Sequence, residues 1–412
     1  MTSRERILRA LRHREADRVG ITDAPWGTTV RRWHEEGLPK NLGPGEYFDY
    51  EFRGQGADTS FQFPSETVEE TDEYTIARNS QGALAKNWKH ATSTPEYFEF
   101  TIKDRKTWEE HKPRLAWNES RVDWNGLKAN KRMRREGHFI TYGGAFGYDK
   151  TQGIVGSQNL LMAMLDDPAW VKDMFDTATQ MLIESLGEML DRGFVFDASF
   201  VYDDMGYRNA SLFSPRCYRE LLLPAHKRFC DFSHSKGLPV ILHSCGRVRE
   251  LVPQLVEAGF DCLQPLEVKA GMDLIELKRN FGDRMAFMGG IDVRAMASDD
   301  PRAIEQEIAT KIPYAKYGGG YIYHSDHSVP DNVSFKRYCR TIELVYYYGS
   351  YGSYPRLSFA PAVVRSRLRQ ARAEAEAKKA VAKKRVTKKP LAKKRVTKKP
   401  AATRRPATHR RG

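Results

Sequence analysis

The stretch Pro239-Val-Ile-Leu-His-Ser-Cys-Gly246 decides how this chain is interpreted. Its apolar first half, Pro239 to Leu242, is typical of a short buried strand, and Gly246 marks a turn after it. From Val248 to Val256 the apolar residues recur at helical spacing. This segment therefore predicts a strand, then a polar loop, then a helix. It leaves an imidazole and a thiol, His243 and Cys245, together at the carboxyl end of the strand.

The same unit recurs along the chain. Short apolar runs that end in polar residues or glycines are found at Val19 to Thr22, Phe139 to Tyr142, Asp197 to Tyr202, Cys262-Leu263, Met285 to Met288 and Tyr321 to Tyr323. Strands that alternate with helices predict a parallel sheet. Short strands with polar residues at their carboxyl ends favour an α/β fold of the (β/α)8 barrel (TIM barrel) type. A doubly wound sheet is the alternative, but no Gly-rich dinucleotide loop follows the first strand.

Two segments depart from this pattern. Residues 39–130 are less regular and rich in aromatics, and we interpret them as an insertion or β-rich cap within a barrel domain that covers residues 1–355. Residues 365–412 hold 20 Lys and Arg against 2 Asp and Glu, and the decapeptide at 381–390 is almost repeated at 391–400. Such a composition predicts a disordered basic tail. The tail would bind nucleic acid by counterion release, or would serve only as a solubilising extension.

Composition excludes several classes of protein. The chain has no apolar run of 18 residues, so no membrane span is expected. Its first 16 residues form a charged amphipathic pattern rather than a signal peptide. The five cysteines are few and irregularly spaced. They argue against a disulfide framework and for a cytoplasmic location.

Candidate site residues gather at the predicted strand ends. His243 and Cys245 together suit zinc, although a buried pair without metal is the alternative. A third ligand would come from His324, Asp326 or His327 at the end of the last strand, and Glu267 is a further candidate. Asp203 and Asp204 follow another strand. One of them would act as a catalytic base or bind substrate, or else one would cap a helix and the other be solvated.

The order of several short motifs resembles the uroporphyrinogen decarboxylase superfamily over roughly residues 3–350. The motifs are Ser3-Arg-Glu-Arg-Ile-Leu-Arg-Ala-Leu11, Asp17-Arg-Val, Asp166-Asp-Pro-Ala-Trp-Val, Asp203-Asp-Met-Gly, Ser214-Pro-Arg-Cys-Tyr-Arg-Glu, His243-Ser-Cys-Gly, Gly271-Met-Asp, Phe287-Met-Gly-Gly-Ile-Asp292 and Gly319-Gly-Tyr-Ile. The resemblance implies a (β/α)8 barrel and one of two chemistries. One is the cofactor-free decarboxylation of a tetrapyrrole in porphyrin biosynthesis. The other is methyl transfer with a corrinoid protein.

The decarboxylase branch of this family carries an Arg-Gln-Ala-Gly-Arg motif after the first strand. Here that stretch reads Pro25-Trp-Gly-Thr-Thr-Val-Arg-Arg, so the motif is missing. The family's Phe-Ser-Asp segment corresponds to Phe61-Gln-Phe-Pro-Ser-Glu66, which lacks the Asp. Both departures argue against decarboxylation.

The methyltransferase branch holds zinc with His-x-Cys and a distant Cys. This chain keeps His243 and Cys245, but the distant region reads His324-Ser-Asp-His-Ser-Val-Pro330, so an imidazole or carboxylate would replace the thiolate. The resemblance implies that a zinc-bound substrate thiolate takes a methyl group from a corrinoid. Asp204 would orient the substrate. The residues that would line or contact the substrate pocket are Trp26, Trp33, Tyr142, Tyr148 and Gln264. A homodimer is also implied.

Overall fold

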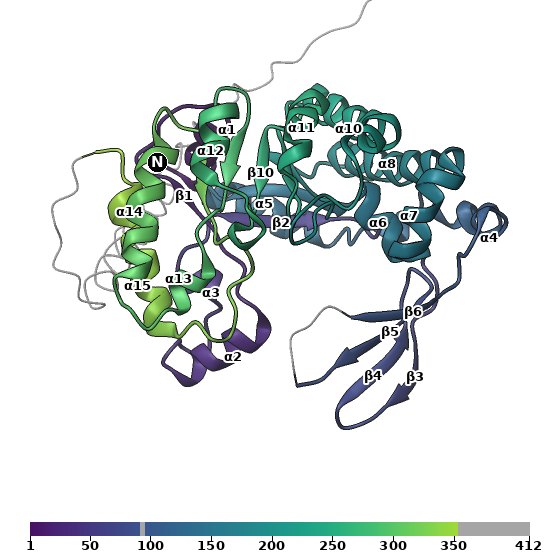
Figure 1. The fold of residues 1–412 in the computed structure, drawn as a ribbon, viewed down its shortest axis with the longest axis horizontal. Coiled ribbons are helices and arrows are strands. Elements are labelled where there is room, and N and C mark those ends of the chain that lie inside the picture. The colour runs from purple at the N-terminus through teal and green to yellow at the C-terminus, as the bar shows by residue number, and fades with distance from the viewer. Residues whose placement is uncertain (91–94, 353–412) are drawn as a thin grey trace, which may run out of the picture. The chain divides into compact units, whose positions relative to one another are not determined.

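Eight parallel strands form one sheet in the computed structural model, which describes residues 1–90 and 95–352 (Figure 1). They are β1 (Gly20–Ile21), β2 (Phe52–Gly56), β7 (Phe139–Ala145), β8 (Ala198–Tyr202), β9 (Val240–His243), β10 (Cys262–Gln264), β11 (Ala286–Met288) and β12 (Tyr321–Tyr323). The order across the sheet is β1-β12-β11-β10-β9-β8-β7-β2, so consecutive strands among the eight are neighbours, except that β1 and β2 form the two edges. The predicted barrel is confirmed. The predicted tail lies outside the described residues.

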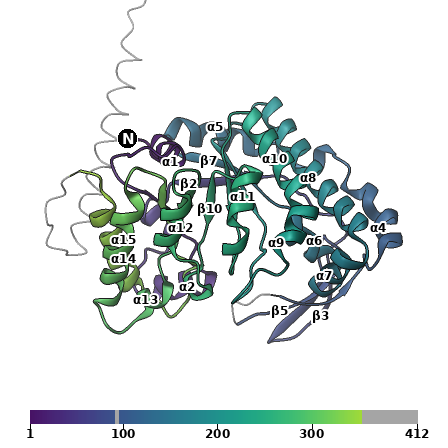
Figure 2. The ribbon, with the colours of Figure 1, turned by 45° about the horizontal axis from the view of Figure 1, so that its top comes forward.

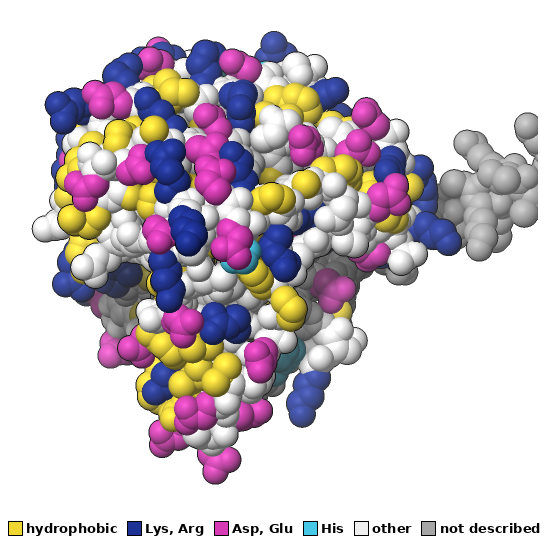
Figure 3. All heavy atoms as spheres, turned by 90° about the vertical axis from the view of Figure 1, so that its right-hand side faces the viewer, with side chains coloured by type: hydrophobic (Ala, Val, Ile, Leu, Met, Phe, Trp, Pro, Cys, Tyr) yellow, Lys and Arg dark blue, Asp and Glu magenta, His cyan; other side chains and the backbone are white. Residues whose placement is uncertain are grey.

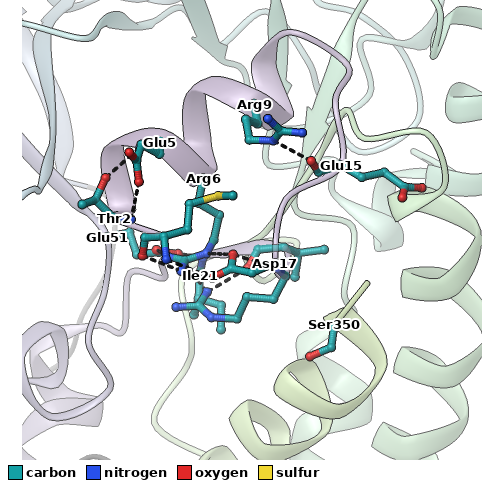
Figure 4. A network of polar contacts seen from close by, with 12 residues as sticks. Thr2, Glu5, Arg6, Arg9, Glu15, Asp17, Ile21, Glu51 and Ser350 are labelled. Carbon is teal, nitrogen blue, oxygen red and sulfur yellow. Dashed lines mark hydrogen bonds and ion pairs between the residues drawn. The ribbon is translucent and has the colours of Figure 1, made fainter. Parts of the chain in front are cut away.

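Glu51 joins the two edges of this sheet, as Figure 4 shows. Its backbone N–H donates to the carbonyl of Ile21 in β1 at 3.0 Å, just before β2 begins. Its fully buried carboxylate accepts the N–H of Ile21 at 2.6 Å and pairs with the guanidinium groups of Arg6 and Arg18. Arg6 also makes two bonds of 2.7 Å to Asp17. The barrel is thus closed by one residue rather than by a long ladder.

Helix α1 (Ser3–Leu11) covers the amino-terminal end of the barrel. Thr2 caps it by accepting the N–H of Glu5, whose carboxylate accepts the N–H of Thr2 in return. The buried residues Ile7, Ala10 and Leu11 of α1 share one apolar cluster with the inward-facing residues of the strands. Because this end is filled, a ligand can be expected only at the carboxyl ends of the strands.

The remaining helices connect the strands (Figure 2). They are α2 (Gly27–Glu35), α3 (Pro44–Tyr47), α4 (Arg105–His111), α5 (Gly126–Glu136), α6 (Gly147–Val155), α7 (Ser157–Asp166), α8 (Pro168–Asp191), α9 (Pro215–Cys217), α10 (Leu223–Ser235), α11 (Val252–Ala258), α12 (Leu274–Phe281), α13 (Val293–Ala297), α14 (Ala303–Lys316) and α15 (Phe335–Gly349). Short 3₁₀ turns occur at Lys112–Leu115, Glu119–Arg121, Arg249–Leu251 and Val268–Ala270, and a π turn at Tyr218–Leu222. Within the described part of the chain, no helix is both long and apolar enough to cross a bilayer.

A separate antiparallel sheet lies between β2 and α5 in the sequence. Its strands, in spatial order, are β3 (Glu66–Glu70), β4 (Tyr74–Arg78), β5 (Ala83–Trp88) and β6 (Glu96–Phe100). The range 39–130 therefore contains barrel strand β2 as well as this sheet. Most of the sheet is exposed, β3 over its whole length. Figure 3 shows the sheet in the lower part of the view, with hydrophobic and acidic side chains side by side on its surface.

Candidate metal centre

The loops after β8 and β9 meet backbone to backbone. Tyr202 and His243 are partners in the parallel register, and the N–H of Asp203 donates to the carbonyl of His243 at 2.9 Å. Gly246 has φ +74°, and a Cβ there would overlap the backbone of Gly206. Only glycine allows this approach without strain. The two sequences Asp203-Asp-Met-Gly206 and His243-Ser-Cys-Gly246 therefore need their glycines for the loops to touch.

This contact brings Asp204, His243 and Cys245 together, with one potential ligand atom from each within 4.8 Å of the others. His243 Nε2 lies 3.4 Å from Asp204 Oδ1 and 3.4 Å from Cys245 Sγ. The N–H of Cys245 donates to Asp204 Oδ1 at 2.7 Å. The side chains of His243 and Asp204 are 21% and 38% exposed, so the cluster is open to solvent on one side.

The donor set fits zinc. A catalytic zinc site takes three protein ligands from thiolate, imidazole and carboxylate and leaves a fourth position for water or substrate. Burial lowers the pKa of His243, which keeps the imidazole neutral as a ligand must be. Burial, with the Asp204 carboxylate second, raises the pKa of the Cys245 thiol. A divalent cation would reverse that effect, because a coordinating thiol loses its proton.

Gln264 fixes the orientation of His243. Its Oε1 contacts His243 Nδ1, which must carry the proton since a carboxamide oxygen only accepts. The lone pair of His243 is then on Nε2, the atom that faces Asp204 and Cys245. Gln264 Nε2 in turn lies 3.4 Å from His324 Nε2, whose Nδ1 is 2.7 Å from the carbonyl of Ser325. The structure thus places His324 behind Gln264 rather than in the cluster.

Two other expected ligands, His327 and Glu267, contact neighbouring loop residues. His327 lies beside Trp26, with ring centroids 5.8 Å apart, and its Nδ1 is 3.4 Å from the carbonyl of Ser328. Glu267 accepts the N–H of Gly246 at 2.7 Å and pairs with Lys269 at 3.0 Å. These contacts leave both residues outside the cluster.

Asp326 accepts the N–H groups of Val268 and Val293, each at 2.9 Å. Burial raises its pKa to about 6. It joins the loops after β10 and β11 instead of reaching the cluster.

Asp203, expected as a catalytic partner of Asp204, is buried away from the cluster. Its Oδ2 lies 2.8 Å from His226 Nε2, and His226 Nδ1 lies 2.9 Å from the hydroxyl of Tyr218. Its Oδ1 accepts the N–H of Asp149 at 2.7 Å. These bonds join Asp203 to the elements that carry Asp149 and His226.

Three aromatics expected at the pocket are buried and contact other parts of the barrel domain. Tyr142 is fully buried and donates to the carbonyl of Leu182 in α8, because side chains alternate along β7 and this one faces the helices. Tyr148 is buried, with its hydroxyl 2.7 Å from that of Ser157. Trp33 is buried and stacks on Tyr338.

Two residues near the cluster were missed. Asp149, in the first turn of α6, is half-buried, and burial followed by Asp204 raises its pKa to about 7. It lies four residues after the end of β7, a position near the carboxyl end of a strand that the sequence already indicated. Tyr202, the last residue of β8, lies with its ring centroid 5.2 Å from that of His243. Its position next to Asp203, at the carboxyl end of a predicted strand, also indicated a place near the site.

Residues 151–348 match the family model described as uroporphyrinogen decarboxylase (URO-D). This segment belongs to the uroporphyrinogen decarboxylase family. It contains strands β8 to β12, and with them all three residues of the cluster. The resemblance stated from the sequence is therefore confirmed.

The relatives that the chain matches include both methyltransferases and uroporphyrinogen decarboxylases. The chain is 28% identical over 143 residues to a methylated-thiol–coenzyme M methyltransferase of Methanosarcina mazei, which is 34% of this chain and 35% of the relative. It is 25% identical over 174 residues to a uroporphyrinogen decarboxylase of Pectobacterium atrosepticum, 41% of this chain and 46% of the relative. It is 30% identical over 116 residues to the methylcobamide:CoM methyltransferase MtaA of Methanosarcina barkeri, 28% of this chain and 32% of the relative. The match spans less than half of each relative.

Among solved structures, a methyltransferase from Methanosarcina mazei superposes with a TM-score of 0.55 at 17% identity. The match covers 84% of this chain and 99% of that one. At this identity the likeness concerns the fold.

Proposed function

We propose that the protein is a zinc-dependent methyltransferase that moves a methyl group between a corrinoid carrier and a thiol or another small substrate. The observation that carries the proposal is the cluster of Asp204, His243 and Cys245 at the carboxyl ends of β8 and β9. The two methyltransferase relatives support it, one through its methylated-thiol substrate and the other through methylcobamide.

Zinc held by the cluster would supply Lewis acidity that keeps a substrate sulfur as a thiolate. In the direction toward the thiol, a sulfur–carbon bond forms and the cobalt–carbon bond breaks. The cobalt keeps the electron pair and goes from Co(III) to Co(I), and the thiol proton passes to water.

The chain's own residues prepare this site. Gln264 holds the proton on His243 Nδ1 and so keeps Nε2 available. Asp204 accepts the N–H of Cys245 while offering its carboxylate to the same centre. Asp149 adds a second carboxyl group close enough for its charge to act on both Asp204 and Cys245. This group can hold or release a proton near neutral pH, as a base for a thiol requires.

The test is the metal content of the purified full-length chain, compared with Cys245→Ser and with Cys217→Ser as a matched control. Cys217 is half-buried at the end of α9 and outside the cluster. We expect about one zinc per chain in the wild type and the control, and loss of most of it in Cys245→Ser.

A second measurement follows methylcobalamin with 2-mercaptoethanol under anaerobic conditions. Decay of the methylcobalamin spectrum, with formation of the methyl thioether, is expected in the zinc-loaded wild type only. Freshly prepared wild type without metal would refute the zinc mechanism. Release of CO₂ from a porphyrinogen would then favour decarboxylation, the activity of the other relatives.

A further inference from the structure

A series of side-chain contacts leads from the carboxyl end of β12 to the metal centre. His324 follows β12 directly, Gln264 is the last residue of β10 and His243 is the last residue of β9. Gln264 Oε1 contacts His243 Nδ1, and Gln264 Nε2 lies 3.4 Å from His324 Nε2. His324 and Gln264 are buried, so protein atoms rather than bulk water must satisfy their polar groups. We refer to these three residues as the His324 chain.

The His324 chain has two possible senses, because a carboxamide can be turned end for end and a neutral imidazole carries its proton on either nitrogen. In the first sense, Gln264 donates to His324 Nε2 and accepts from His243 Nδ1. In the second sense, His324 Nε2 donates to Gln264, and Gln264 donates to His243 Nδ1. The proton of His243 is then on Nε2. Only the first sense leaves the lone pair of Nε2 free on the side of Asp204 and Cys245.

The surroundings of His324 Nδ1 select the first sense. This nitrogen lies 2.7 Å from the carbonyl oxygen of Ser325 and 3.6 Å from Asp23 Oδ1. Carbonyl and carboxylate oxygens only accept, so Nδ1 must carry the proton. In a neutral ring Nε2 then has the lone pair and accepts a hydrogen from the amide of Gln264. The amide oxygen is left for His243, whose proton stays on Nδ1.

Asp23 acts as an acceptor toward every group around it, which fixes this assignment. Its Oδ1 accepts the hydroxyl of Ser325 at 2.5 Å, and its Oδ2 accepts the hydroxyls of Tyr323 at 3.2 Å and Tyr338 at 2.8 Å. The side chain of Asp23 is fully buried. The end of the His324 chain that is remote from the metal centre is therefore held by buried groups near β1, in β12 and in α15.

We propose that His324 is a positioning residue for the metal centre, which orients Gln264 so that the proton of His243 stays on Nδ1. His324 is outside the cluster, and it acts through the intervening amide. The tautomer of His243 follows from the hydrogen bonds alone. Its consequence for zinc rests on the proposed function, because an imidazole binds a metal through the nitrogen that has no proton.

The experiment records long-range ¹H–¹⁵N NMR spectra of the full-length, chelator-treated protein with ¹⁵N-labelled histidine at pH 8, where an unperturbed imidazole is neutral. Loss of a signal in His243→Gln and in His324→Gln assigns the two rings. In the wild type, we expect both rings to carry the proton on Nδ1 only.

Two variants of His324 test its role. His324→Phe removes the acceptor of the Gln264 amide, so either orientation of the amide becomes open. We expect a substantial part of His243 to carry its proton on Nε2, and zinc affinity to fall about 10–100-fold. His324→Gln supplies an amide that can donate to the carbonyl of Ser325 and accept from Gln264. It should return the proton of His243 to Nδ1 and restore most of the zinc affinity.

His327→Phe is the matched control, since His327 belongs to the same loop but contacts Trp26 and Ser328. It should leave the signals of His243 and His324 unchanged. Thermal denaturation of each variant verifies that it folds. The wild-type spectrum needs no variant, so a variant that does not fold leaves that part of the test in place.

The proposal is overturned if wild-type His243 carries its proton on Nε2, if His324→Phe leaves the tautomer unchanged, or if His327→Phe shifts it equally. A wild type that shows both protons on Nδ1 but binds no zinc would refute the metal site and support the role of His324. A wild type that binds zinc, but carries the His243 proton on Nε2 when metal-free, would refute only the role of His324.

Discussion

Replacing Glu51 by Gln tests how the barrel closes. The carboxylate of Glu51 is fully buried, and it contacts Arg6, Arg18 and the N–H of Ile21. Glutamine keeps the shape and one acceptor oxygen. It removes the negative charge and turns an NH₂ group toward a guanidinium. The variant therefore isolates the charge that holds β1 to β2 from the space that the side chain fills.

The expected loss of folding free energy follows from the charged groups that contact Glu51. Breaking a buried ion pair costs about 3–5 kcal/mol because the remaining charge is left uncompensated. Arg6 keeps both its bonds to Asp17, so the lower end of that range applies, about 3 kcal/mol. With an unfolding entropy of about 2.1 cal/mol/K per residue over roughly 350 residues, this corresponds to a decrease in Tm of about 4 °C.

The assay is thermal denaturation of the full-length protein followed by circular dichroism at pH 7. Glu70→Gln is the control. It removes one partner of the pair with Lys89, but its side chain is 61% exposed, and such a pair contributes about 0–1 kcal/mol. A decrease in Tm below 1 °C for Glu51→Gln, or one equal to that of the control, would refute the view that this buried charge closes the barrel.

Three further outcomes are expected. Gln264→Leu should lower zinc affinity about 10–100-fold in competition with a chromophoric chelator, because His243 loses the partner that fixes its proton. Asp204→Asn should lose zinc, and its metal-free form should have the Tm of the metal-free wild type. Asp203→Asn should retain zinc and have a lower Tm, since Asp203 is buried against His226; the reverse pattern would contradict both assignments. The Arg6 guanidinium holds the pKa of Asp17 down to about 2 although burial opposes it. Its contribution to stability is present above about pH 4 and lost as the pH falls toward 2, so urea midpoints of wild type and Asp17→Asn should differ at pH 6 and converge near pH 2.

Sequence patterns were sufficient to predict most of the strands of the barrel. Seven of its strands were predicted, because each is an apolar run with a glycine or a helix on either side. The strand β2 was missed. Its sequence, Phe52-Arg-Gly-Gln-Gly56, has two glycines and two polar residues, and glycine is depleted in strands. It is a strand because the barrel provides a neighbour in β7, which no local pattern reveals.

The site was predicted less completely. His243 and Cys245 could be paired from the sequence because only Ser244 separates them at one strand end. Asp204 was assigned to catalysis rather than to the cluster, since the contact between its loop and the next one depends on Gly206 and Gly246. His324, Glu267 and Asp326 were plausible ligands by residue type. Their backbone and amide partners, which only the structure provides, place them outside the cluster.

The pairing of Tyr202 with His243 in the parallel register has a consequence for the metal binding that we propose. Main-chain hydrogen bonds between two central strands set the separation of the three donor groups, so the site is preorganised by the barrel itself. Metal binding would then have no folding to drive, unlike in small zinc domains that are unfolded without the ion. The free energy of coordination would be retained as affinity, and we expect that a bound metal could be removed and replaced while the barrel stays intact.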